Sequence, residues 1–173
     1  MANKKVAIIM GSDSDWSVLE VAETTLQQFN VEVQVLVASA HRTPERVHDF
    51  VSSARENGIG VIIAAAGAAA HLPGVIAAYT TLPVIGVPID ATTLGGMDAL
   101  LSIAQMPSGI PVGTMAINGA KNAALYAVEM LAVSDESLME KLAQHRQEMA
   151  AEVEKKATRL DKLRADKQIG GKK

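Results

Sequence analysis

The stretch Val31-Glu32-Val33-Gln34-Val35-Leu36-Val37 runs directly into Ala38-Ser39-Ala40-His41-Arg42-Thr43-Pro44. Its first half places β-branched residues at alternate positions, which predicts a strand. Thr43-Pro44 predicts a helix start, with Thr as the capping residue and Pro at the first helical position, where the missing N–H costs nothing. A short turn over residues 39–42 therefore joins the carboxyl end of a strand to a helix N-terminus. Ligands bind at that edge of open α/β sheets.

The same strand–turn–helix pattern recurs along the rest of the chain. Further strands are expected at 6–10, 60–66, 83–89 and 111–117, and helices at about 16–30, 44–57, 75–79, 96–104 and 120–133. This alternation predicts one α/β domain over residues 1–164, with a parallel sheet covered by helices on both faces. A long helix from about 137 to 164 is mostly charged after Glu152, and residues 165–173 are expected to be disordered. This helix either packs on a neighbouring subunit or on its own domain.

Composition excludes several classes of protein. A chain of 173 residues is long enough to bury a real core in one domain. Its net charge of −3 gives no basic field for nucleic acid or an anionic membrane. The chain has no cysteine, so disulfides, thiolate metal sites and a cysteine nucleophile are excluded, and the cytoplasm is the expected location. The longest apolar run, 59–70, is too short to span a membrane.

The first predicted turn, Gly11-Ser12-Asp13-Ser14-Asp15-Trp16, has the layout of a phosphate-binding βα turn. Glycine permits close approach, the hydroxyls of Ser12 and Ser14 can donate, and a helix N-terminus supplies free N–H groups. The carboxylate of Asp15 suits ribose hydroxyls better than an anion. The same residues also suit simple capping of the helix.

His41 is the strongest single candidate for chemistry. An imidazole can give and take a proton near neutral pH, and the adjacent Arg42 can bind a phosphate or carboxylate through two parallel hydrogen bonds. The alternative interpretations are a structural histidine and a surface salt bridge. His71 follows small residues that let a ligand approach the backbone, although a tightly packed turn has the same composition. His48 and His145 are expected at the surface, and no cluster has metal-ligand spacing, so no metal is predicted.

Four stretches together resemble the signature sequences of class I N5-carboxyaminoimidazole ribonucleotide mutases. They are Gly11 to Trp16, Ser39 to Pro44, Gly67-Ala68-Ala69-Ala70-His71-Leu72-Pro73-Gly74 and Gln105-Met106-Pro107-Ser108-Gly109-Ile110-Pro111-Val112-Gly113. The resemblance covers residues 5 to 145 in order. It implies a three-layer α/β/α, flavodoxin-like (Rossmann-like) fold with a five-stranded parallel sheet. It also implies a homo-octamer with active sites near subunit contacts, and a reaction without metal or organic cofactor.

The implied reaction belongs to purine (IMP) biosynthesis. A carboxylate moves from the exocyclic nitrogen of the substrate to ring carbon C4, through decarboxylation and recarboxylation. His41 protonates the substrate, CO2 stays trapped, C4 attacks it, and the same histidine removes the C4 proton. Arg42 and the serines are assigned to phosphate and Asp15 to ribose. The substrate-binding positions carried over from the family are Ser12, Ser14, Asp15, Ser39, Arg42, Gly67, His71 and Leu72.

This chain departs from the family pattern at Ala65 and Ala68, where members commonly have glycine, and its loop at 117–122 looks shorter. The added methyl groups either narrow the CO2 pocket or stiffen the turn. Three other functions stay open. A class II enzyme would carboxylate aminoimidazole ribonucleotide directly with CO2. A flavodoxin-like electron carrier needs aromatic walls, and only Trp16 lies in a ligand turn. A phospho-receiver module needs an aspartate where Ala66-Gly67 stands.

Overall fold

The computed structural model describes residues 4–170, with side chains described as far as Arg164. The strands are β1 (Lys5–Met10), β2 (Val33–Val37), β3 (Ile59–Gly67), β4 (Val84–Ile89) and β5 (Gly113–Thr114). The helices are α1 (Trp16–Gln28), α2 (Pro44–Ala54), α3 (Leu72–Tyr79), α4 (Met97–Ala104), α5 (Ala120–Ala132) and α6 (Glu136–Gly170), and a short 3-10 turn, η1 (Asp13–Asp15), precedes α1. No helix in this part of the chain is long and apolar enough to cross a membrane.

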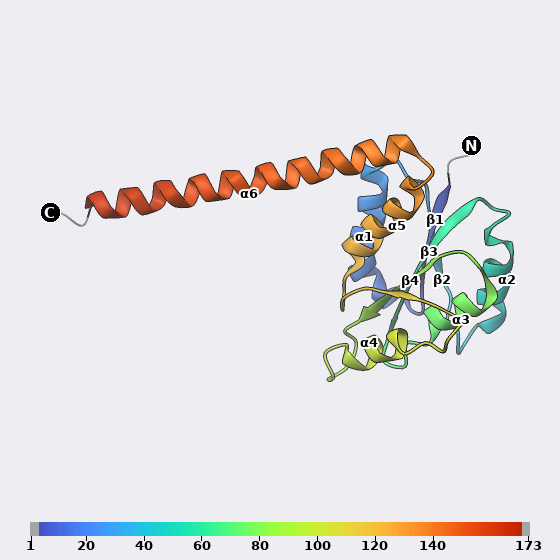
Figure 1. The fold of residues 1–173 in the computed structure, drawn as a ribbon. Coiled ribbons are helices and arrows are strands. Elements are labelled where there is room, and N and C mark those ends of the chain that lie inside the picture. Colours follow the sequence, from blue (N-terminus) through green and yellow to red (C-terminus); the bar gives the residue numbers. More distant parts are fainter. Residues whose placement is uncertain (1–3, 171–173) are drawn as a thin grey trace.

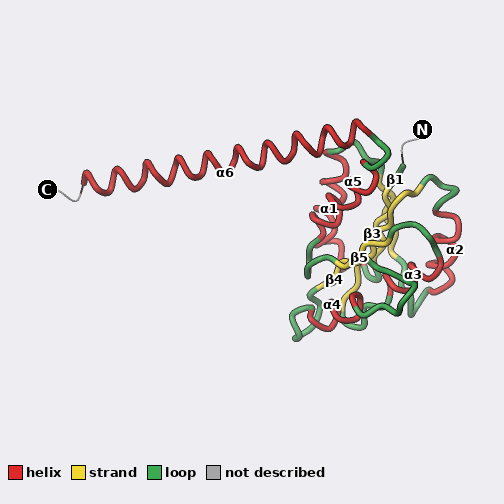
Figure 2. The backbone as a smooth tube through the Cα atoms, viewed as in Figure 1, coloured by secondary structure: helices red, strands yellow, loops and turns green. Residues whose placement is uncertain are grey.

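The five strands form one parallel sheet in the order β2-β1-β3-β4-β5. This is the flavodoxin-like order, in which the direction of winding reverses between β1 and β3. Figure 2 shows the strands in yellow in the middle of the domain, with helices in red around them. Met10, the last residue of β1, is level with Val37 on one side and Ala65 on the other. The carboxyl ends of these three strands therefore meet at one edge. The predicted three-layer α/β/α fold with a long C-terminal helix is confirmed.

Helices cover both faces of the sheet (Figure 1). Because side chains alternate along β1, each face of the sheet has its own apolar layer. Val6, Ile8 and Met10 pack on one face against α1 and α5. Ala7 and Ile9 pack on the other face against α2, α3 and α4. The face under α5 is covered largely by buried alanines, which let helix and sheet approach closely. This tight packing holds the strand ends in fixed relative positions.

Several element boundaries and one histidine differ from the sequence-based expectations. Helix α3 begins at Leu72, before its expected start near Val75, because Pro73 fits the first turn of a helix. Helix α2 ends at Ala54, before its expected end near Asn57.

β5 pairs with β4 only at Gly113 and Thr114 and not over the expected 111–117. Toward its carboxyl end the ladder lacks a donor, because Pro88 in β4 has no N–H. Helix α6 extends to Gly170, past its expected end near 164, and residues 171–173 of the predicted disordered tail lie outside the described residues. His48 is exposed as expected, but His145 is half-buried with its ring edge-on to Phe29, so its predicted surface position is wrong.

Candidate active site

A cavity of about 340 Å³ opens at the carboxyl edge of the sheet, where β1, β2 and β3 end. The turns that follow these strands bring together eight of the nine residues predicted for the site. Those eight lining residues are Ser12, Ser14, Asp15, Ser39, His41, Arg42, Gly67 and Leu72. The ninth, His71, lies behind His41 instead of on the cavity wall. The volume suits a small-molecule ligand.

The turn after β1 is organised by hydroxyl groups. Ser12 caps η1, since its Oγ accepts from the N–H of Ser14 at 3.3 Å, and the Ser14 hydroxyl donates to the same oxygen at 2.8 Å. Asp15 follows at the capping position of α1, but its side chain makes no capping bond. It is only 8% exposed, and this burial raises the pKa of its carboxyl group although hydrogen bonds from Ser14 and Ser12 oppose the shift.

Asp15→Asn is expected to stabilise the folded protein near neutral pH. A carboxyl group whose folded pKa is raised stabilises the fold below its unfolded pKa, and this contribution is lost as the pH rises through the folded pKa. Asn avoids that loss, so we expect a higher Tm at pH 7.5. In a chain of this size each 1 kcal/mol of added stability raises the Tm by roughly 2–4 °C. The difference between the two proteins should shrink toward the ordinary Asp pKa of about 3.9.

The matched control is Asp49→Asn, because Asp49 is exposed on α2. Asp13 is unsuitable, since its charge also raises the pKa of Asp15. Thermal melts of the native protein and the two variants from pH 4 to pH 8 make the comparison. A Tm for Asp15→Asn at or below that of Asp49→Asn at pH 7.5 would show that burial of Asp15 carries no cost.

The turn after β2 is held by its own backbone and one threonine. The N–H of Ser39 donates to the Thr43 hydroxyl at 2.9 Å, the N–H of Thr43 donates to the Ser39 carbonyl at 2.9 Å, and the N–H of Arg42 donates to the Ser39 hydroxyl at 3.3 Å. Thr43 is at the capping position of α2, as predicted. Its hydroxyl forms hydrogen bonds within this turn, however, and makes no capping hydrogen bond to the helix. Arg42 donates from its guanidinium to the carbonyl of Gly11 at 3.1 Å, which joins this turn to the first one.

The two histidines of the site are in direct contact. His41 Nε2 lies 2.9 Å from His71 Nδ1, and the ring planes are nearly perpendicular at 89°. One nitrogen must donate and the other accept, so the proton between them fixes the tautomer of each ring. Nδ1 of His41 has no protein partner among the described residues. It is therefore the nitrogen available to a ligand.

Comparison with known proteins shows which protein family has such a site. Residues 5–152 match the AIR carboxylase family. The chain belongs to the AIR carboxylase family. Its relatives include the N5-carboxyaminoimidazole ribonucleotide mutase of Pyrococcus horikoshii, 54% identical over 91% of this chain and 89% of the relative. The mutase of Thermotoga maritima is 48% identical over 92% of this chain and 93% of the relative.

A solved structure supports the same assignment. The crystal structure of Treponema denticola PurE superposes with a TM-score of 0.81 at 26% identity and covers 91% of this chain and 98% of that one. The resemblance inferred from the four sequence stretches is thus confirmed. Among the described residues of this AIR carboxylase family member, no group of three His, Asp or Glu side chains has an arrangement that could hold a metal ion.

The segment after β3 places small residues against the cavity. A Cβ on Gly67 would lie 2.6 Å from the Cβ of Ala91, so a larger residue at 67 would push the two turns apart. Ala91, which follows β4, also lines the cavity and was missed by sequence reasoning. The sequence did hold a signal for this position, because Ala91 follows the strand that lies next to β3 in the sheet. Ala68 has a left-handed φ of 53°.

Ala68→Gly is expected to leave stability unchanged or raise it by up to about 1.5 kcal/mol. The left-handed backbone costs an alanine about 1–2 kcal/mol, while glycine loses about 0.5–1 kcal/mol through its greater freedom in the unfolded chain. Ala66→Gly is the matched control, since Ala66 lines the same cavity from within β3. It should destabilise the protein. Urea denaturation of both variants measures the difference, and equal losses would mean that Ala68 is not strained.

Proposed function

We propose that this chain is an N5-carboxyaminoimidazole ribonucleotide mutase of purine biosynthesis. Five mutase relatives from bacteria and archaea are 48–57% identical to it, and the matches cover 83–94% of their lengths. The observation that carries the proposal is the position of His41, whose unpartnered Nδ1 lies on a cavity between a hydroxyl-rich turn and the Gly67 turn. The proposed reaction transfers the carboxylate from the exocyclic nitrogen to C4 of the imidazole.

The hydroxyl-rich side of the cavity suits a ribose phosphate. Ser12, Ser14 and Ser39 can donate hydroxyl hydrogen bonds, and α1 and α2 both begin at this edge of the sheet. Arg42 uses one guanidinium nitrogen on Gly11, which leaves further N–H groups for phosphate oxygens. Asp15 is placed to accept hydrogen bonds from the ribose hydroxyls. The base then extends toward Gly67 and Leu72.

His41 is proposed as the one general acid and base. Protonated His41 gives its Nδ1 proton to the carboxylated nitrogen of the substrate and becomes neutral, the N–C bond breaks with its electrons kept on nitrogen, and CO2 is released into the cavity. The electron-rich C4 attacks this CO2, and Nδ1 takes back the C4 proton, so the enzyme ends in its initial state. Proton transfer by a positioned imidazole contributes about 10²–10⁴-fold, and holding CO2 beside C4 adds the advantage of proximity.

His71 is proposed as the residue that positions the His41 ring. In the acid form His41 carries protons on both ring nitrogens: its Nε2–H donates to Nδ1 of His71, which fixes the ring, and its Nδ1–H faces the substrate. After the Nδ1 proton is given up, neutral His41 keeps the same Nε2–H bond to His71, and the lone pair on Nδ1 is ready to act as a base. This contact supports a single imidazole in both half-reactions.

We further propose the homo-octamer implied by the family resemblance, with sites near subunit contacts, in the cytoplasm and without a cofactor. His41 and Arg42 are exposed in the single chain, which supports a site that neighbouring subunits complete. Closure by a neighbour would also exclude water from the released CO2.

The proposed function is tested by offering the purified protein two substrates without ATP or metal. We expect turnover of N5-carboxyaminoimidazole ribonucleotide to the C4-carboxylate without added bicarbonate. Turnover only of aminoimidazole ribonucleotide with high CO2 would assign the protein to the direct carboxylases. A failure to convert either substrate would refute the enzyme assignment.

A further inference from the structure

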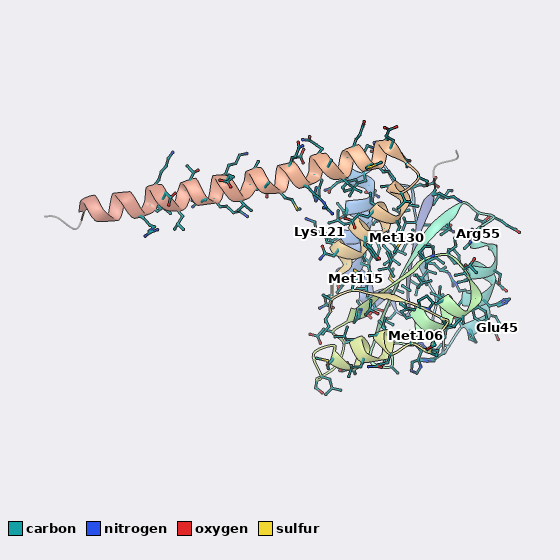
Figure 3. All side chains as sticks on the ribbon, viewed as in Figure 1. Glu45, Arg55, Met106, Met115, Lys121 and Met130 are labelled. Atoms are coloured by element: carbon teal, nitrogen blue, oxygen red, sulfur yellow. The ribbon has the colours of Figure 1, made fainter. Side chains whose placement is uncertain are left out.

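Helix α6 continues well beyond the domain that it begins on (Figure 1). Leu138 is buried and Leu142 half-buried against the domain, but every side chain from Arg146 to Arg164 is exposed in the single chain. Side chains project from this outer part of the helix with no other element beside them (Figure 3). Most helical stability in proteins comes from packing of an apolar face. A long helix without such packing is therefore expected to pack against a partner.

The exposed part of α6 has an apolar stripe with the spacing of a coiled coil. Positions 142, 149, 156 and 163 repeat every seven residues, and positions 146, 153 and 160 lie four after the first three of them. This alternating spacing of four and three residues keeps these positions on one side of each helix. Two supercoiled helices can then pack against each other along this seam. The outer seam residues are Met149, Val153, Lys156, Leu160 and Leu163. The four apolar ones are 47–61% exposed, although they are the residues a seam would bury.

We propose that α6 pairs with α6 of a second copy as an antiparallel two-stranded coiled coil. The charged residues that flank the seam, Glu152 and Arg159, determine whether the two helices run parallel or antiparallel. In a parallel pair Arg159 would face Arg164 of the second copy, which repels, and Glu152 would face only Ala157. In an antiparallel pair Glu152 faces Arg159 of the second copy, and the two-fold axis repeats this unlike-charge contact.

The same charges select one register. With Glu152 beside Arg159 of the second copy, Met149 packs on Leu160 and Val153 packs on the aliphatic stem of Lys156. A shift of one heptad in one direction places Glu152 against Glu152, and a shift in the other direction places Arg159 against Arg159. The register with unlike charges also sets Ala150 opposite Ala157 of the second copy, where two small side chains allow close approach.

An apolar cavity at the inner end of the seam fits this arrangement. It has a volume of about 550 Å³, lies between α5 and α6, and is lined in part by Tyr126, Arg146 and Met149. Tyr126 is 40% exposed in the single chain. In the proposed register Leu163 of the second copy lies opposite Arg146, so its side chain reaches the rim of this cavity. The seam and the cavity then form one continuous contact surface.

The absence of cysteine in the native chain makes a direct test possible. Ala150→Cys, Ala157→Cys and the variant with both changes are treated with a short bismaleimide and run on a denaturing gel. The proposed register predicts a cross-linked dimer from the double variant and only background from each single variant. Both alanines are exposed and outside the active site, so turnover on the purine substrate should stay at the native level in all three proteins.

Other cross-linking patterns would overturn the proposal. Dimer from Ala150→Cys alone, or from Ala157→Cys alone, would place the helices in one of the two shifted registers. No dimer from any variant would show that α6 does not pair with itself. Turnover of the purine substrate is measured separately on the same proteins, so failure of this proposal and failure of the proposed function are distinguishable.

Charge reversal gives an independent readout. In the double-cysteine background, Glu152→Arg replaces both unlike-charge contacts by repulsion and should weaken pairing by about tenfold, seen as a loss of cross-linked dimer. Adding Arg159→Glu restores unlike charges and should recover the dimer. Equal yields in all three backgrounds would contradict the Glu152–Arg159 contact.

Discussion

Replacement of His41 by Asn is expected to lower kcat by at least about 10²–10⁴-fold while fold and assembly are kept. Asn retains a polar group of similar shape, but it can neither give nor take a proton near neutral pH. Of the histidines in the described part of the chain, His41 alone lines the cavity, and Nδ1 of His71 lies 2.9 Å from its Nε2. No other imidazole among the described residues can reach the substrate in its place.

His48→Asn provides the matched control, because the same substitution is made at an exposed histidine on α2 outside the cavity. Steady-state kinetics on N5-carboxyaminoimidazole ribonucleotide should show native turnover for this variant. If His41→Asn retained kcat within a factor of a few, the proton transfer would have to be assigned to another group.

Arg42→Ala is expected to raise KM by roughly 10–100-fold with a smaller effect on kcat. A hydrogen bond between charged groups contributes about 1.5–3 kcal/mol, and each 1.36 kcal/mol corresponds to a factor of ten. The substitution also removes the contact with the Gly11 carbonyl that joins the first two turns. Arg42→Lys should recover part of the loss, since Lys keeps the charge but lacks the planar two-pronged donor.

Arg46→Ala controls for the general loss of a positive charge, because Arg46 is exposed one turn further along α2. Its KM should remain close to the native value. An unchanged KM in Arg42→Ala would refute the assignment of Arg42 to the phosphate and would leave the hydroxyl groups of the turns as the phosphate ligands.

The sequence was sufficient for most of the site because the site is built from local patterns. Each of the first three strands ends in a turn whose residue types predict a helix start, and parallel strands bring such turns to one edge. The observed register, which places Met10 level with Val37 and Ala65, agrees with this rule. The His41 turn and the Gly11 turn could therefore be expected to meet before any coordinates were known.

Contacts between distant side chains were not predictable in the same way. Nothing in the sequence pairs His41 with His71, since their contact depends on the packing of α3 against β3 and on two ring orientations. The early end of β5 depends on which residue of β4 would have to donate to it, and Pro88 cannot. Burial of Asp15 and the left-handed backbone at Ala68 likewise depend on the packed structure.

Retention of an isotopic label tests the central claim most directly. N5-carboxyaminoimidazole ribonucleotide carrying ¹³C in its carboxylate is converted by the native enzyme in excess unlabelled bicarbonate, and the product is examined by mass spectrometry. If CO2 is released and recaptured beside His41 within one closed cavity, the C4-carboxylate keeps the label. A product that carries mostly unlabelled carboxylate would show that CO2 leaves the site, and the trapping mechanism would be wrong.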